Sequence, residues 1–197
     1  MMKKNTILTI IIVAILCLTG CNNSNVKSLN ENIKKMELTG NLITHNAYYH
    51  NVVEYEKKAG TGITHLFEKN RKMFIEYTGT IKLGIDLTKV KVDVKGNEIN
   101  VFIPKATIIG EPNVDKDDFE AKNFIESKEG INKNPITVDD ASEAFDKAQK
   151  NMKENASKDN ELLSLAQKRA KVILEENIKE FSKLNDNEYT INWEYGQ

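Results

Sequence analysis

The sequence predicts an α+β protein with an antiparallel-dominated sheet, covered on one face by two C-terminal helices and completed by a final C-terminal strand. Three observations predict this class. Apolar and polar residues alternate in several runs between residues 38 and 103, as they do in strands with one buried face. Apolar residues recur every three or four positions between residues 137 and 183, as in amphipathic helices. Alternation returns over residues 189–195, and strands followed by helices are typical of α+β proteins.

The N-terminal segment has the layout of a bacterial lipoprotein signal. A positively charged start precedes an apolar stretch over residues 7–18, and Leu18-Thr19-Gly20-Cys21 resembles a lipobox. The apolar stretch is shorter than the roughly 20 residues of a transmembrane helix, although an uncleaved anchor helix is the alternative. We expect cleavage between Gly20 and Cys21 and lipidation of Cys21, which would anchor the protein on the extracytoplasmic side of the cell membrane.

This signal divides the chain into three parts. Residues 1–20 would be the signal peptide, residues 21–37 a lipidated tether, and residues 38–197 a single α+β domain. Without residues 1–20 the chain would have 26 basic and 29 acidic residues, a net charge of about −3, which argues against nucleic acid as a partner because nucleic-acid binders carry a basic face. Cys17 and Cys21 are the only cysteines, so a domain that begins at a lipidated Cys21 has neither a disulfide nor a cysteine metal site.

The first elements of the domain are predicted to be strands. Residues 38–55 are rich in aromatic and β-branched types and predict one or two strands. The clearest alternation runs from Met73 to Leu87. Within it, Gly79 and Gly84 indicate a bulge, a close backbone approach or a division into two shorter strands.

A hairpin and a long connection follow. Two runs rich in valine and isoleucine flank Gly96-Asn97, which is typical of a hairpin turn. Pro104 closes the second strand, because proline has no amide hydrogen for the ladder. Residues 110–135 show little periodicity and predict a connection with one helical turn near residues 117–119. Connections of this length are often functional, so we expect contacts with a partner there.

The C-terminal third predicts two helices and a strand. Thr137-Val138-Asp139-Asp140 fits a capping box, which starts a helix that continues to about Asn155. A second helix over about residues 160–183 carries one broad apolar face. Residues 189–195 predict a terminal strand that pairs back into the sheet, in an orientation that the sequence leaves open. Its aromatic residues suit core packing better than a binding surface.

Two runs in the strand region resemble the sequence pattern of a known family. Gly84-Ile85-Asp86-Leu87 ends an alternating strand, and a valine-rich strand and the apolar run Ile103–Ile108 with its proline follow. This pattern is similar to the domain-of-unknown-function family 4230, which is found in bacterial membrane-anchored proteins. The resemblance covers about Leu38 to Tyr195. It implies the architecture but no activity, and no functional residue follows from it.

Asp86 is the residue we single out as a ligand-binding or structural site. A carboxylate between Ile85 and Leu87 must find hydrogen-bond donors. We expect Asp86 to cap the following turn through the amides of Thr88 or Lys89, and the alternative is that it lines a functional pocket.

Other chemistry-bearing residues give weaker patterns. A metal site would need His45, His50 and His65 to converge, but His45 and His50 lie five apart and point to opposite faces of a strand. The acidic residues between Asp115 and Glu120 could gather a cation, but they lack the spacing of a calcium loop and predict a solvated acidic loop. Serine-nucleophile, phosphate-loop and dinucleotide motifs are absent, so we assign no catalytic residue, metal ligand or cofactor.

These observations predict a membrane-anchored lipoprotein that acts as a binding or interaction module of the cell envelope, with an envelope protein or a glycan as partner. Two alternatives stay open. One is an envelope enzyme with an unrecognised site around Asp86 and the histidines, and the other is a structural or stress-response lipoprotein.

Overall fold

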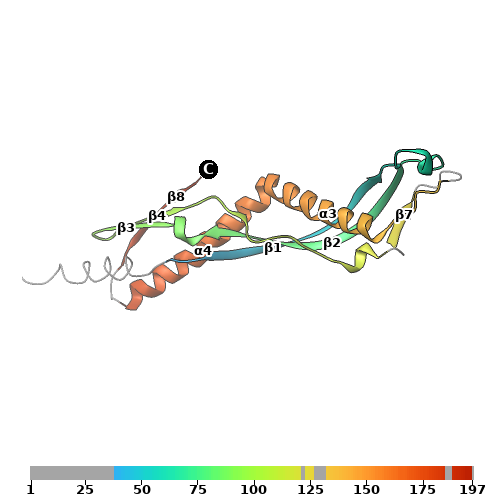
Figure 1. Ribbon diagram of the computed structural model, residues 1–197. Helices are drawn as coiled ribbons and strands as arrows, with labels where there is room; N and C mark the ends of the chain where they lie inside the picture. The colour runs from blue at the N-terminus through green and yellow to red at the C-terminus, as the bar shows by residue number, and fades with distance from the viewer. Residues whose placement is uncertain (1–37, 121–122, 127–131, 185–187, 197) are drawn as a thin grey trace, which may run out of the picture.

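The computed structural model describes residues 38–120, 123–126, 132–184 and 188–196. It is an elongated α+β structure in which two helices lie along a long β-ribbon and a smaller sheet adjoins one end (Figure 1). The predicted fold class is confirmed: the sheets are mainly antiparallel, two C-terminal helices are present and a strand follows them. The described strands form two sheets, however, of five and three strands.

The long ribbon consists of β1 (Asn41–Lys57) and β2 (Arg71–Asp86), which are antiparallel along their whole length. Residues 38–55 therefore contribute to one strand rather than two. Along both strands, side chains buried toward the helices alternate with side chains on the opposite face, as the sequence predicted. The fully buried side chains of this inner face are Val53, Met73, Ile75, Tyr77, Ile81, Leu83 and Ile85.

The two glycines of β2 are positions of close approach and do not divide the strand. A Cβ atom on Gly84 would collide with the carbonyl of Leu42, whose carbon would lie 2.8 Å away. The register of the ribbon shifts beside this contact, between Ile43 and His45, which identifies a β-bulge. Gly79 is equally crowded, by α3 and by a short strand described next.

Three short strands cover the second edge of β2. These are β5 (Thr107–Ile108), β6 (Asn113–Val114) and β7 (Phe124–Glu126), all antiparallel to β2. The predicted helical turn is present as the 3-10 helix η3 (Asp117–Phe119). The prediction of a plain connection over residues 110–135 was incomplete, because β6 and β7 lie inside it. Strands of two or three residues are too short to show an alternating pattern.

Helices α3 (Val138–Lys158) and α4 (Asn160–Leu184) follow one another along the inner face of the ribbon (Figure 1). The predicted capping box is present, because the Thr137 side chain accepts from the Asp140 amide while the Asp140 side chain accepts from the Thr137 amide. Asp159 separates the helices and accepts from the amides of Glu161 and Leu162 through Oδ1, at 3.1 and 3.0 Å. One residue of the predicted apolar face of α4, Leu165, is exposed.

The smaller sheet contains β3 (Lys91–Lys95), β4 (Glu98–Ile103) and β8 (Thr190–Tyr195). The 3-10 helix η2 (Leu87–Lys89) leads from β2 into β3, and the predicted hairpin turn has Gly96 at a φ of +60°. β8 pairs with β4 in parallel, which answers the question of orientation that the sequence left open. Its aromatic residues divide, since Trp193 packs against the core and Tyr195 is exposed.

The hydrophobic core lies between the inner face of the ribbon and the helices and continues under the smaller sheet. Alanines and Met152 of α3 and Leu163, Ala166 and Ala170 of α4 supply the helical side. Gln167 of α4 contacts the end of the smaller sheet, because its Nε2 donates to the carbonyls of Pro104 after β4 and Gly196 after β8, at 3.0 and 3.2 Å. All described core residues lie between Leu38 and Trp193, so the chain from Leu38 onward carries this core.

Candidate functional site

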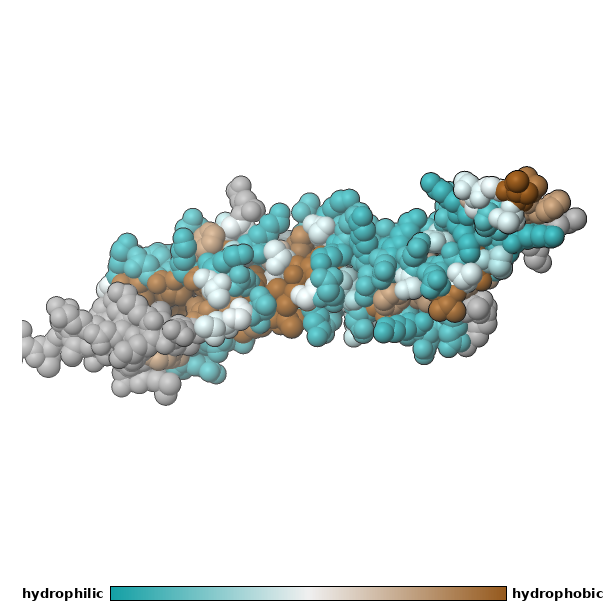
Figure 2. All heavy atoms as spheres, viewed as in Figure 1, coloured by the Kyte–Doolittle hydropathy of each residue, from teal (hydrophilic) through white to brown (hydrophobic). Residues whose placement is uncertain are grey.

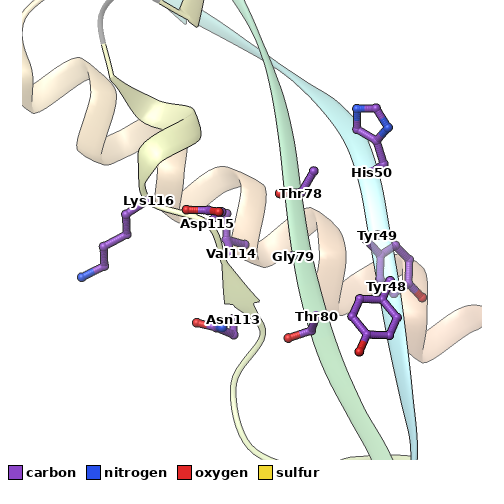
Figure 3. Close-up of a pocket in the computed structure, with 10 residues that line it drawn as sticks. All are labelled: Tyr48, Tyr49, His50, Thr78, Gly79, Thr80, Asn113, Val114, Asp115 and Lys116. Carbon is purple, nitrogen blue, oxygen red and sulfur yellow. The ribbon is translucent and has the colours of Figure 1, made fainter.

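An open groove lies on the outer face of the ribbon, where β6 crosses beside the middle of β2 (Figure 3). Its volume is about 700 Å³. β1 lies on one side of β2 and β6 on the other, so three segments that are distant in the sequence supply the lining. The lining residues are Tyr48, Tyr49, His50, Thr78, Gly79, Thr80, Asn113, Val114, Asp115 and Lys116.

Gly79 forms the floor of the groove, and its lack of a side chain allows β6 and α3 to approach β2 closely at this point. It pairs with Tyr49 on one side and Val114 on the other. A Cβ atom here would clash with the methyl group of Met152 and would lie 2.8 Å from the carbonyl oxygen of Asn113. The absence of a side chain therefore lets α3 pack under this point while β6 pairs from the side.

The strand side of the groove presents an aromatic ring among small polar groups. Tyr48 is 82% exposed and pairs across the ribbon with Thr80, while His50 pairs with Thr78. His50 Nε2 lies 2.5 Å from Glu76 Oε1, which holds the imidazole against the outer face. These side chains come from alternate positions of the two strands, so they all project away from the helices.

The other side of the groove is a turn fixed to the edge of β2. The Asp115 amide donates to the Thr78 carbonyl at 3.0 Å, and the Thr78 amide donates to Asp118 Oδ2 at 2.7 Å. Asp115 Oδ1 accepts from the Asp117 amide at 3.0 Å. In Figure 3 the Lys116 side chain extends away from the strands. Asp115 and Asp118 thus use carboxylate oxygens to shape their own loop.

Tyr49 contributes an inner wall. It stands on the side of β1 that faces the helices, and its hydroxyl is buried without a hydrogen-bond partner among the described residues. Burial, followed by the negative charge of Asp159, raises the pKa of Tyr49 above its usual value. A neutral phenol beside Gly79 makes this wall largely apolar.

The structure places Asp86 outside the groove, in the turn that the sequence predicted it would cap. Asp86 Oδ1 accepts from the Thr88 amide at 3.0 Å and from the Thr88 hydroxyl at 2.5 Å. Lys89 Nζ lies 3.4 Å from the other oxygen. The hydrogen bond from the Thr88 side chain is the main reason that the pKa of Asp86 lies below its usual value.

The three histidines are not brought together. His45 is half-buried on the inner side of β1, whereas His50 is exposed on the outer side, so the two point to opposite faces. His65 belongs to the loop between β1 and β2 and lies 2.8 Å from Glu68. In the part of the chain that the structure describes, no group of three or more His, Cys, Asp or Glu residues is arranged to hold a metal ion.

The predicted lipidation site lies outside the described residues. Gly20 and Cys21 belong to the segment 1–37, of which the structure describes nothing. None of the described helices is long and apolar enough to cross a membrane.

Sequence patterns pointed to the outer polar face but missed the groove. Thr78 and Thr80 occupy wet positions of the strongest alternating run, and residues 110–135 were expected to make functional contacts. The sequence did not reveal that β6 pairs with Gly79 and Thr80, because only Asn113 and Val114 make this pairing. The adjacent tyrosines Tyr48 and Tyr49 were the available signal, because the alternation of a strand places one of the two rings on the outer face.

Comparison with known proteins assigns the chain to a family. The model of the family described as "Protein of unknown function (DUF4230)" matches residues 34–191, and the chain belongs to this family. No curated protein and no solved structure matches the chain.

Proposed function

We propose that this DUF4230 protein is a lipid-anchored module of the bacterial cell envelope that binds a glycan in the groove beside Tyr48. One observation carries the proposal. A widely exposed tyrosine ring stands in a groove whose other polar lining groups are hydroxyls, a carboxamide, a carboxylate, an imidazole and the ammonium group of Lys116. Binding sites combine an aromatic platform with a few convergent polar groups in this way.

The chemistry of the groove suits a sugar ring. The C–H face of a sugar can stack on Tyr48, while its hydroxyls exchange hydrogen bonds with Thr80 and Asn113. The Thr78 amide and carbonyl are already used by Asp118 and Asp115, so the walls are held in place before a ligand arrives. Such preorganisation lowers the entropy cost of binding.

The lipobox supports the location. Lipidation of Cys21 would keep the domain at the membrane surface, where two acyl chains anchor stably and one alone does not. Mass spectrometry of the native N-terminus tests this part. A diacylglycerol-modified Cys21 is expected, and an unmodified Cys21 or a retained Met1 would contradict the anchor.

Binding itself is tested with soluble peptidoglycan fragments, titrated calorimetrically against the chain from Leu38 onward. We expect Tyr48→Ala to weaken binding at least tenfold, because the stacking platform is lost. Tyr195→Ala is the matched control, since Tyr195 is also an exposed strand tyrosine but lies on the smaller sheet. Absence of binding by the parent chain, or an equal loss in the control, would contradict the glycan site.

The enzyme hypothesis has a separate test. Asp86 caps a turn and His45 lies half-buried elsewhere, so neither takes part in the groove. We expect genes that carry Asp86→Asn and His45→Ala, separately and together, to complement a deletion strain as well as the parent gene does. Failure of the combined variant, with normal amounts of folded protein, would favour an enzyme.

A further inference from the structure

The loop between β1 and β2 forms an apolar tip at one end of the molecule. β1 runs from Asn41 to Lys57, roughly 55 Å at 3.3 Å per residue, so the tip lies far from the start of the domain (Figure 1). Three large apolar side chains project from it: Ile63 is 87% exposed, Leu66 72% and Phe67 64%. Figure 2 shows the apolar surface at this extremity. Single exposed apolar residues are common, but three adjacent ones indicate a contact surface.

The tip is a built structure that holds these side chains outward. The 3-10 helix η1 (Ile63–His65) begins after Gly62, whose carbonyl accepts from the His65 amide at 3.1 Å. Glu68 turns inward and accepts from the Gly60 amide at 2.9 Å. His65 and Glu68 thus bond within the loop, whereas Ile63, Leu66 and Phe67 face the solvent.

Residues ahead of α3 clamp the base of the tip. Asn134 is 3% exposed, and its side-chain amide donates to the carbonyls of Lys58 and Lys69, both at 3.1 Å. Asn132 Oδ1 accepts from the Lys69 amide, and the Lys133 amide donates to the Phe67 carbonyl, both at 3.1 Å. A buried carboxamide that joins both strands at the loop base fixes the direction in which the tip points.

The tip is also positively charged, in contrast to the whole chain. Residues 57–72 contain five Lys or Arg and one Glu, whereas the chain has a net charge of −1. Lys57, Arg71 and Lys72 have acidic partners. Among the described residues, no carboxylate pairs with Lys58 or Lys69, and Lys133 Nζ lies 5.0 Å from the centre of the Phe67 ring. Unpaired cations therefore surround the apolar side chains.

We propose that this tip inserts Ile63, Leu66 and Phe67 into the interface of an anionic lipid bilayer, with Lys58, Lys69 and Lys133 on the headgroups. A narrow protrusion with an apolar end and a basic collar matches the two layers of a membrane surface, which are apolar below and negatively charged above. The charge difference between the tip and the rest of the chain would also orient the molecule tip first. The proposal needs neither the groove nor the anchor at Cys21.

The test is cosedimentation of the chain from Leu38 onward with vesicles of phosphatidylcholine, with and without phosphatidylglycerol. Removal of residues 1–37 excludes binding through the predicted anchor at Cys21, and the described core is retained. We expect binding to the anionic vesicles, and at least a tenfold weaker partition for the variant Ile63→Ser, Leu66→Ser, Phe67→Ser. Ile125→Ser with Val138→Ser is the control, because these side chains are 67% and 85% exposed elsewhere.

The collar is tested by Lys58→Gln with Lys69→Gln. Each lysine should account for about a fivefold change in partition to the anionic vesicles, so the double variant, which keeps Lys133, should bind them about 25-fold more weakly than the parent. Circular dichroism melting checks that the exposed substitutions leave the fold intact. Failure of the parent to bind anionic vesicles, equal binding by the serine variant, or self-association of the parent through the tip in ultracentrifugation would overturn the proposal. Glycan binding in the groove is a separate readout.

Discussion

The two faces of the β1–β2 ribbon come from alternate residues of the same strands, yet they differ in almost every property. Ile75, Ile81 and Leu83 on the inner face are fully buried under the helices. Tyr48 and His50 on the outer face are exposed, and the groove opens there. Period-two geometry separates the residues that stabilise the fold from those that can contact a ligand.

Electrostatics differ between the faces in the same way. On the inner side, Asp140 accepts from Lys57 Nζ at 2.6 Å and from the Thr137 amide at 2.7 Å, and it is almost fully buried. On the outer side, Lys72 and Glu54 form a pair in which both side chains are about half exposed. Exposed pairs contribute roughly 0–1 kcal/mol, whereas charged hydrogen bonds at buried sites contribute more.

Replacement of neighbouring residues of β2 gives the sharpest contrast. Ile81→Ala should lower the free energy of unfolding by about 2–5 kcal/mol, because it removes a buried side chain and leaves a cavity. Lys82→Ala, one residue further on the outer face, should change it by less than about 0.5 kcal/mol. Urea denaturation of both variants measures the difference, and similar losses would mean that the outer face is also packed.

Asp140→Ala should have the next largest effect on the free energy of unfolding. The substitution removes the N-cap partner of Thr137 and leaves Lys57 with only the Pro135 carbonyl, so we expect a loss of about 2–3 kcal/mol. Asp139→Ala is the matched control, since Asp139 is exposed in the same helical turn. An equal effect in both variants would show that helix-end charge matters here and the buried contact does not.

The carboxylate of Asp140 should also make the stability of the fold depend on pH in the acidic range. Burial raises the pKa of Asp140, but hydrogen bonds from Lys57 and Thr137 lower it further, so the folded-state pKa lies below the unfolded value of about 3.9. Its stabilising contribution is therefore present above about pH 4 and is lost as the pH falls through the folded-state pKa. Between pH 5 and pH 2, the parent should lose more stability than Asp140→Asn. Parallel pH profiles of thermal unfolding would contradict this.

Substitutions of outer-face residues in the groove should have the smallest effect on stability. We expect His50→Ala and Thr80→Ala each to change the free energy of unfolding by less than about 0.5 kcal/mol, because their pairs are exposed. Chemical denaturation measures this. A loss above 1 kcal/mol in either variant would show that the groove residues stabilise the ribbon, and reduced binding would then need another explanation.

Much of the fold could be predicted because its signals are local. The alternation from Met73 to Leu87 identified the inner face of β2, and Thr137 with Asp140 identified the start of α3. The turn at Gly96 was equally clear. In each case the residues that form the element are neighbours in the sequence.

The remaining features depend on pairing between distant residues. β6 consists of two residues, and only its contact with Gly79 and Thr80 makes it a strand. β8 belongs to the smaller sheet through its parallel pairing with β4, about 90 residues away in the chain. Asp86 was singled out because it is polar in an apolar run, but its partners lie in the next turn and not in a ligand site.

The sequence by itself determined the elements, the buried faces and the caps, because periodicity and side-chain chemistry act over a few residues. It also carried the run ending at Cys21 that resembles a lipobox, which lies outside the described residues. Only the tertiary structure decided where those elements meet. The groove beside Tyr48 and the clamped tip at Phe67 each join segments more than 60 residues apart, and such contacts leave no periodic trace in the chain.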